Sequence, residues 1–129
     1  MTKFIAVEGC QLQFQNGGQG TINITPGQTS TKVKFGGKAA YKTIKFTVTN
    51  YVGGEITIPL PPPAISGSGE IQASSQHVKV EGNKVILEGD VSATITMNGQ
   101  KPAGSSTAPA TNPEVIKMVS AGQTKAKGA

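Results

Sequence analysis

The sequence predicts an all-β protein of short strands and tight turns, with essentially no helix. Apolar and polar residues alternate with a period of two along much of the chain, which is the pattern of strands with one buried face. No window has a convincing helical periodicity. The 17 glycines and 8 prolines of the 129 residues fall between the alternating segments, where turns are expected.

The first half of the chain contains the clearest alternation. Residues 10–14 alternate apolar side chains with Gln and end at Asn16-Gly17-Gly18, which marks a turn. Residues 44–49 alternate Ile, Phe and Val with Lys and Thr, so they predict a strand with one buried face. The strands expected in this half are residues 4–7, 10–14, 21–25, 33–35, 44–49 and 56–58.

The second half begins with a polyproline stretch at 59–63, which favours a stiff crossover between two β halves over a ligand for an SH3-like groove. The strands expected after it are residues 78–80, 85–87, 95–97 and 115–119. The segment 101–113 is rich in Pro, Ala, Ser and Thr and predicts a loop. We expect one domain over residues 1–120 and a flexible C-terminal tail over 121–129.

The charged residues argue against a nucleic-acid partner. The formal net charge is +5, and all twelve basic residues are Lys. Arg is the side chain suited to bidentate contacts with phosphate and guanine, and it is absent. Aromatic residues make up only 5% of the chain. We therefore expect no nucleic-acid binding.

The N-terminal residues do not resemble a secretory signal, because Met1–Leu12 contains Glu8 and Gly9 and no apolar core. No run approaches the roughly 20 apolar residues that span a bilayer. The lone Cys10 cannot form an internal disulfide. We expect synthesis in the cytoplasm, with later export by a machine that reads no signal peptide left open.

No sequence motif indicates an enzyme, since GxSxG, HExxH, GxxxxGK and CxxC patterns are all missing. Glu88 and Asp90 lie two residues apart, but the intervening glycine and the scarcity of aromatic rings favour a solvated turn over a glycosidase-like pair. Cys10 and His77 have no evident third partner that would orient a nucleophile. We expect no catalytic and no cofactor-binding residues.

A short internal repeat is visible. Residues 78–84 align without gaps on residues 95–101, both reading apolar, polar, apolar, polar, Gly, polar, Lys, and residues 33–38 form a looser copy. Each copy predicts a strand entering a hairpin whose glycine needs a positive φ. The glycines expected in these turns are Gly36, Gly37, Gly82 and Gly99.

The second half also resembles a known family. Residues 78–90, with Asn-Lys after the turn glycine and a closing Gly-Asp, are similar to the hairpin of PAAR-repeat proteins. Upstream, residues 65–69 resemble the family's Ile-x-x-Gly-Ser step, and residues 98–103 resemble its Asn-Gly-Lys-Pro-Ala turn. The resemblance covers residues 65–103, while residues 1–58 match only in style.

The resemblance implies a small conical β domain with pseudo-three-fold hairpins. Such domains cap the trimeric spike of contractile injection systems, namely type VI secretion systems, contractile phage tails and tailocin-like particles. One copy would sit on each spike trimer and sharpen it for envelope penetration, with or without effector cargo, and would make transient contact with the target membrane. The chain would then be delivered outward on contraction. Lys38, Lys84 and Lys101 would occupy related positions for docking on the spike.

The sequence departs from the family in two respects. Leu87 stands where the return strand of the family carries Arg. The family commonly holds a metal near the tip with three His and one Cys, but only Cys10 and His77 exist here, and a closed zinc site needs four ligands. Zinc is therefore not expected unless Glu88 or Asp90 completes a site. The alternative function is a small β-sandwich binding module, such as a phage-tail adhesin or carbohydrate binder, which would need an exposed aromatic platform.

Overall fold

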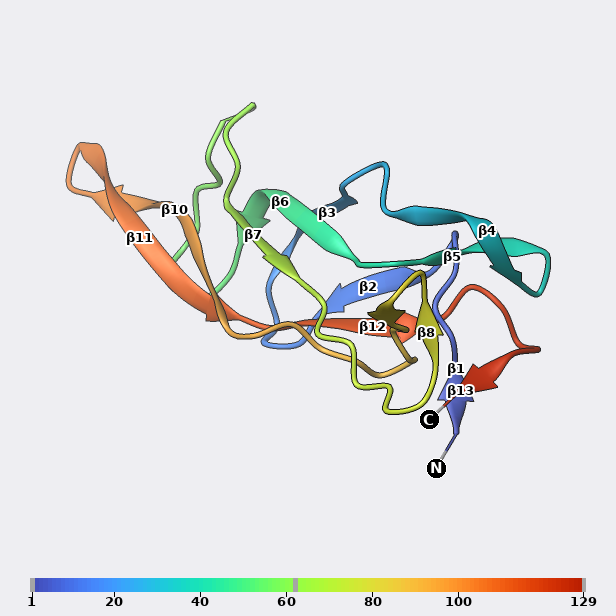
Figure 1. The fold of residues 1–129 in the computed structure, drawn as a ribbon. Coiled ribbons are helices and arrows are strands. Elements are labelled where there is room, and N and C mark those ends of the chain that lie inside the picture. Colours follow the sequence, from blue (N-terminus) through green and yellow to red (C-terminus); the bar gives the residue numbers. More distant parts are fainter. Residues whose placement is uncertain (1, 62, 129) are drawn as a thin grey trace.

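The computed structural model describes residues 2–61 and 63–128 of the chain. These residues form thirteen strands and no helix, which confirms the all-β class (Figure 1). Since the described part contains no helix, it also contains none long and apolar enough to cross a membrane. Every pairing between named strands is antiparallel.

The strands build one three-stranded sheet, ordered β3-β6-β7, and five two-stranded sheets, which pair β1 with β13, β2 with β12, β4 with β5, β8 with β9, and β10 with β11. The strand bounds are β1 Lys3–Phe4, β2 Gln11–Phe14, β3 Gln19–Ile24, β4 Thr29–Phe35, β5 Lys38–Tyr41, β6 Lys45–Val52, β7 Gly67–Glu70, β8 Lys79–Val80, β9 Asn83–Lys84, β10 Ile95–Ala103, β11 Ser106–Glu114, β12 Ile116–Ser120 and β13 Lys127–Gly128.

Strand β6 supplies the centre of the core, as its alternation predicts. Ile44, just before the strand, and Phe46 and Val48 within it are buried, whereas Lys45 between them is exposed. The main cluster draws apolar side chains from all along the chain. A second, smaller cluster joins the regions of β1, β5, β8 and β9, and consists of Ile5, Ala40, Val80, Val85 and Leu87.

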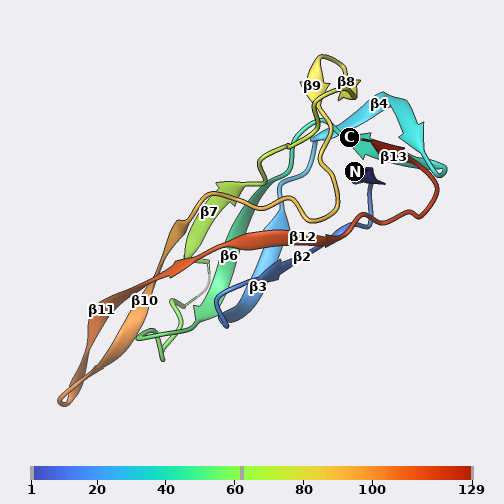
Figure 2. The ribbon, with the colours of Figure 1, turned by 90° about the horizontal axis from the view of Figure 1, so that it is seen from below.

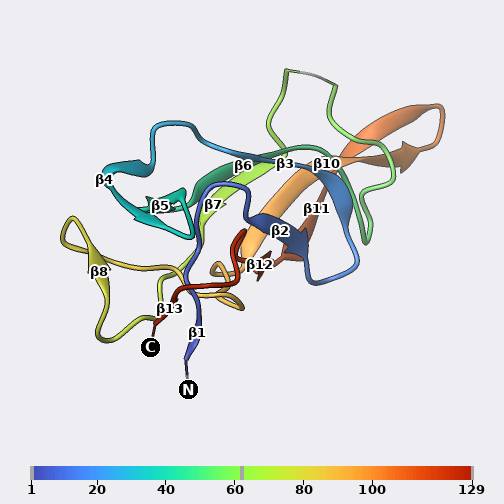
Figure 3. The ribbon, with the colours of Figure 1, turned by 90° about the vertical axis from the view of Figure 1, so that its right-hand side faces the viewer.

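The molecule is elongated and tapers toward one end. Figure 2 shows the β10–β11 ribbon forming the narrow end, while β1, β4, β8, β9 and β13 gather with both termini at the opposite, broad end. Figure 3 shows the same separation from the side. The segment leading into β7 approaches the ribbon near the narrow end, where Asn98 donates its backbone N–H to Ser66 O at 2.8 Å.

The prediction of a loop at 101–113 is wrong. These residues complete β10 and form most of β11, which pair along nine consecutive positions. Pro and Ala are poor strand formers, and the side chains of Ser and Thr are polar, so the segment shows no apolar alternation in the sequence. A ribbon of two strands needs only one hydrogen-bonding edge from each strand, so it can include residues that a central strand could not.

The three prolines of the β10–β11 ribbon all lie in cross-strand pairs that exchange no backbone hydrogen bond. Pro109 lies opposite Gln100, and Pro102 and Pro113 occupy the same alternate set of pairs. The backbone polar groups of Gln100 point away from β11. Its N–H donates to Ile58 O at 2.9 Å, and its C=O accepts the Ile58 N–H at 3.0 Å. The three prolines therefore lie where β11 and β10 exchange no N–H bond, so none removes a ladder hydrogen bond.

The prediction of a turn at Gly99 is also wrong. Gly99 lies in the middle of β10, opposite Ala110, and is not among the glycines with positive φ. A Cβ built on it would overlap Ile56 Cγ2. Glycine is needed here because Ile56 packs directly on the strand, and the sequence pattern cannot distinguish this close approach from a turn.

The other predicted turn glycines have the expected conformation. Gly82 has a φ of +84°, and Gly36 and Gly37 have φ values of +60° and +81°. Two of the three repeat copies are thus real hairpins, β4–β5 and β8–β9, while the copy at 95–101 is a straight strand. The three copies are not equivalent in the structure.

Two further segments differ from their predicted form. Residues 85–87 are buried but form no strand of their own, and Leu87 makes only a single bridge to Ile5. Residues 56–58 likewise make only isolated bridges. Of the polyproline stretch, Pro62 lies outside the described residues, and Ala64 donates its N–H to Pro61 O at 3.0 Å.

Residues 121–128 pack on the domain instead of forming a free tail, and Ala129 lies outside the described residues. Gln123 donates to Ile5 O at 2.9 Å and accepts from the N–H groups of Lys125 and Ala126 at 2.7 Å. Strand β13 then pairs with β1. The segment looks like a tail in the sequence because Lys, Gly and Thr dominate it, yet its backbone is tied by one buried glutamine side chain.

Candidate functional site

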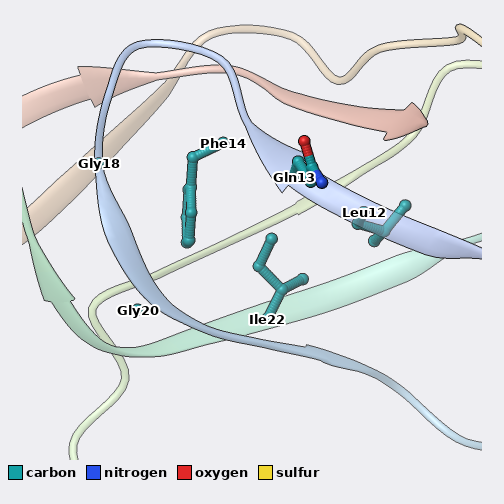
Figure 4. A pocket seen from close by; sticks show the side chains of 6 residues that line it. All are labelled: Leu12, Gln13, Phe14, Gly18, Gly20 and Ile22. Carbon is teal, nitrogen blue, oxygen red and sulfur yellow. The ribbon is translucent and has the colours of Figure 1, made fainter.

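A groove runs between β2 and β3, the two strands that flank the turn at 15–18. Two adjoining hollows form it, with volumes of about 410 and 300 Å³. Leu12 and Ile22 line both hollows, and Figure 4 shows them facing one another with Phe14 beside them. Among residues 2–61 and 63–128, no charged side chain lines either hollow. We call this feature the β2–β3 groove; its lining residues are Cys10, Gln11, Leu12, Gln13, Phe14, Gly18, Gly20, Ile22 and Ile24.

Beneath one end of the groove lies a buried polar cluster. The Tyr51 hydroxyl donates to Glu114 Oε2 at 2.7 Å and accepts from Asn112 Nδ2 at 2.8 Å. The other carboxylate oxygen of Glu114 accepts the Asn16 backbone N–H at 2.6 Å. Tyr51 and Glu114 are both fully buried. The cluster therefore ties β6, β11 and the turn after β2 together.

The chain makes room for Tyr51 with two glycines. A Cβ on Gly18 would overlap the Tyr51 ring, and a Cβ on Gly53 would lie 2.6 Å from its hydroxyl oxygen. Phe14 packs edge-on against the same ring, with centroids 5.4 Å apart. Burial, followed by the hydrogen bond to Glu114, raises the pKa of Tyr51 to about 12. A fully enclosed pair with this pKa serves as a structural anchor and is not open to a substrate.

Asp90 has a structural role as well. Its carboxylate accepts hydrogen bonds from Ser74 Oγ, from the Ser74 N–H at 3.1 Å and from the Leu87 N–H at 2.8 Å. The expectation of a solvated turn does not hold for Asp90, which is buried. The nearby Glu88 accepts the Ala121 N–H at 3.3 Å. Both carboxylates thus hold backbone groups of their neighbours.

Cys10 and His77 lie in different surroundings. Cys10 is a buried residue in the lining of the β2–β3 groove, whereas His77 is exposed in the segment before β8. Across the described residues, no three His, Cys, Asp or Glu side chains gather into a group that could hold a metal ion. Burial raises the pKa of the Cys10 thiol to about 11, which disfavours the thiolate that a nucleophile or zinc ligand requires.

The state of Cys10 gives a first testable prediction. At pH 8 the native protein should react with a thiol reagent such as iodoacetamide at least tenfold more slowly than the protein unfolded in urea, because the native thiol is both buried and protonated. Mass spectrometry of timed samples measures the rate. Equal rates in the two states would show that Cys10 is accessible and ionised in the fold.

The three lysines expected at related positions are not together. Lys38 and Lys84 belong to the hairpins at the broad end, whereas Lys101 lies on β10 in the ribbon (Figure 1). Lys101 is paired with Glu55, with Nζ and Oε2 3.8 Å apart. Lys101 is separated from the other two lysines because β10 does not turn at Gly99. The strand continues along the ribbon, and Lys101 lies two residues further on.

Lysines are concentrated at the broad end of the molecule. The segments that meet there, residues 3–8, 32–42, 79–88 and 125–127, carry nine of the twelve lysines and three acidic residues, namely Glu8, Glu81 and Glu88, and Glu70 lines the same hollow as Lys42 and Lys84. The remainder of the chain carries three lysines and four acidic residues. The nine lysines are Lys3, Lys32, Lys34, Lys38, Lys42, Lys79, Lys84, Lys125 and Lys127.

These nine lysines form no ion pair with any described acidic residue. Two of them have other partners: Lys38 Nζ donates to Gly122 O at 2.9 Å, and Lys127 Nζ lies 4.8 Å from the centre of the Phe4 ring. The broad end is therefore a positively charged surface whose charges remain free to meet an acidic partner.

No aromatic ring of the described residues is fully exposed. Phe46 and Tyr51 are buried, and the other four rings are half-buried against one or other apolar cluster. The large apolar side chains that are exposed in the described part of the chain are Ile65 and Val91.

Comparison with known proteins gives no relative. No family model, no curated protein and no solved structure matches the chain. The geometry of the chain itself is thus the basis for a functional proposal.

Sequence reasoning missed the Tyr51–Glu114 cluster and the groove. Glu114 lies in a segment without visible periodicity, so nothing in the sequence marks it as buried. One signal was available: no charged residue occurs between Glu8 and Lys32, the longest uncharged stretch before the polyproline region. That stretch forms the walls of the groove.

Proposed function

We propose that the chain is a non-enzymatic structural protein that caps a trimeric β-helical spike of a contractile injection system. The broad end is the docking face, and the tapered β10–β11 ribbon points away from the spike. The role is mechanical: a domain of densely bonded short strands passes force from the spike to the target envelope, with or without an attached effector.

One observation carries this proposal: the shape and the charge of the molecule are polarised along the same axis. The broad end carries the excess lysines, and the tapered end carries the one ion pair between described residues, Lys101–Glu55. A cap that docks in a single orientation needs two ends that differ in this way, because charge complementarity sets orientation and encounter rate.

The environments of four reactive side chains also support a structural role. Glu114 and Asp90 are occupied by donors from the protein, and Tyr51 and Cys10 are buried with raised pKa values. A general base or nucleophile must reach its substrate and have a pKa near the working pH. These four groups, Glu114, Asp90, Tyr51 and Cys10, thus serve the fold.

The docking face can be tested with matched charge reversals. Binding to a trimeric β-helical spike protein of a contractile injection system should be measured at low salt for the wild type, Lys84→Glu and Lys101→Glu. The variant at the broad end should associate at least fivefold more slowly, and the variant in the ribbon should differ less than twofold. Slower association of Lys101→Glu alone would place the docking face at the narrow end, against the proposal.

A further inference from the structure

The edge strands β2 and β3 face each other across the groove without pairing. Strand β2 pairs with β12 on one side, and β3 pairs with β6 on one side. Each therefore has a second edge that no strand of the described residues covers, and the β2–β3 groove lies between these two edges (Figure 4). A free strand edge presents a row of backbone donors and acceptors to a partner.

The outward backbone groups of β3 can be identified from the ladder. Thr25 donates its N–H to Lys45 O at 2.9 Å, while Val48 accepts from Ser66 on the opposite side of β6 at 2.7 Å. Antiparallel pairs alternate between bonded and non-bonded, so Ile22, opposite Val48, and Ile24 direct their N–H and C=O away from β6. Those groups point toward the groove.

The same reasoning applies to β2. Gln15 donates its N–H to Val115 O at 2.9 Å, so Gln13 belongs to the bonded set and the alternate residues Leu12 and Phe14 direct their backbone groups away from β12. Both walls of the groove thus combine apolar side chains with outward backbone donors and acceptors.

These two edges lack the devices that normally prevent strand addition. Proteins protect free edges with lysine, other charges or proline. Among the thirteen strands of the described residues, β2 and β3 are the two that contain neither a charged residue nor a proline. The protection is missing from the two strands that border the groove.

We propose that the β2–β3 groove binds an extended, uncharged segment of a partner protein, which adds as a strand to the free edge of β3. A strand bonded to both edges would need them about 10 Å apart. Some Cα atoms of β2 and β3 lie within 8 Å. The segment therefore pairs with the longer strand, β3, and its side chains lie across Leu12 and Phe14 of β2.

The chemistry of the walls defines the segment. The uncharged lining provides no counter-charge, so a Lys or Asp facing into the groove would lose water without gaining an ion pair. Alternating small apolar side chains suit the pleat of an added strand, with its backbone supplying most of the affinity. This proposal does not depend on the spike-cap function.

Amide hydrogen exchange by NMR tests the edge directly. In the free protein the amides of Ile22 and Ile24 should exchange at least tenfold faster than those of Asn23 and Thr25, which bond β6. Equal protection of all four amides at every protein concentration would show that the edge is already closed. Protection of Ile22 that grows with protein concentration would assign the groove to a second copy. Either outcome overturns the proposal.

A synthetic probe tests the occupant. A blocked heptapeptide of alternating Thr and Val should slow exchange of Ile22 and Ile24 at least tenfold, and the same peptide with Lys in place of Val should not. A version N-methylated at alternate residues, which lacks the N–H groups on one edge, should lose binding. If the methylated and Lys peptides bind as well as the first, strand addition is wrong.

Matched variants complete the experiment. Ile22→Lys places a charge in the groove, and Asn23→Lys places the same charge on the exposed opposite face of the same strand. We expect the first to abolish binding of the Thr-Val peptide and the second to leave it within twofold. Equal binding by both folded variants would contradict the proposal, and should Ile22→Lys fail to fold, the exchange rates of the wild type still decide.

Discussion

Replacing Gly99 by alanine should destabilise the protein by about 3 kcal/mol, near the upper end of the range for overpacked sites. The new methyl group would overlap Ile56 Cγ2, and both residues are buried, so neither can turn into solvent. The free energy of unfolding in urea, measured by circular dichroism, provides the comparison. The effect far exceeds the few tenths of a kcal/mol that an exposed strand substitution typically costs.

Two controls distinguish overlap from loss of a turn. Gly104→Ala alters a glycine with a φ of +66° and open space around it, so only the backbone preference is lost, at about 1 kcal/mol. Ile56→Ala removes the atom that Gly99→Ala would strike, so the double variant should be less destabilised than the sum of the two single variants. Strict additivity would mean that Gly99 is required for another reason.

Removing the acceptor at Glu114 should have a comparable or larger effect. Glu114→Ala leaves the Tyr51 hydroxyl and the Asn16 N–H buried without their partner and opens a cavity, for a cost of about 4 kcal/mol. Tyr51→Phe should cost about 2 kcal/mol, because it withdraws one donor from the buried carboxylate. The matched control is Tyr41→Phe, whose hydroxyl forms no hydrogen bond among the described residues and should cost less than 1 kcal/mol.

The pH dependence of stability provides a separate check on Tyr51. Its pKa rises from 10.0 to about 12 on folding, so the fold favours the protonated hydroxyl. This contribution is fully present below pH 10 and is lost as the pH rises toward 12. Cys10 and Tyr41 also have raised pKa values and act in the same direction. The wild type should therefore lose more stability between pH 10 and 12 than Tyr51→Phe does. If the free energy of unfolding falls equally with pH in both proteins, the Tyr51 hydroxyl is not held protonated by the fold.

The sequence was sufficient where alternation and turn chemistry coincide. Strand β6 is recognisable because every second residue from Ile44 to Val48 is large and apolar. The turn at Gly82 is recognisable because its backbone needs a positive φ, which glycine adopts readily. Local patterns of this kind report local geometry, so they identified the all-β class and most strands of the first half.

Long-range contacts account for what the sequence could not reveal. Position 99 requires glycine because Ile56, more than forty residues away in the sequence, occupies the space of a Cβ atom. Position 18 requires glycine because the ring of Tyr51 does the same. The ribbon strand β11 is held by backbone pairing with β10, not by apolar alternation, so its prolines and alanines suggest a loop. Glu114 looks like a surface residue until its partners, Tyr51 and Asn16, are brought to it by the fold.

The candidate site likewise has one feature that is visible in the sequence and others that only the fold reveals. The uncharged stretch from residue 9 to residue 31 is visible in the sequence, but its meaning depends on which edges of β2 and β3 remain unpaired. The grouping of nine lysines at one end is not visible at all, since they are scattered from Lys3 to Lys127 and meet only when β13 returns to β1.

The stoichiometry of the complex with the spike tests the central proposal most directly. A cap with one broad docking face should be a monomer alone and should bind one copy per spike trimer, over an interface of at least ~1,200 Å² in total. Native mass spectrometry of the co-purified complex gives the number of copies. A mass corresponding to three spike chains and one copy of this protein is the predicted result. Three copies per trimer, or a stable homotrimer of this chain in the absence of the spike, would contradict it.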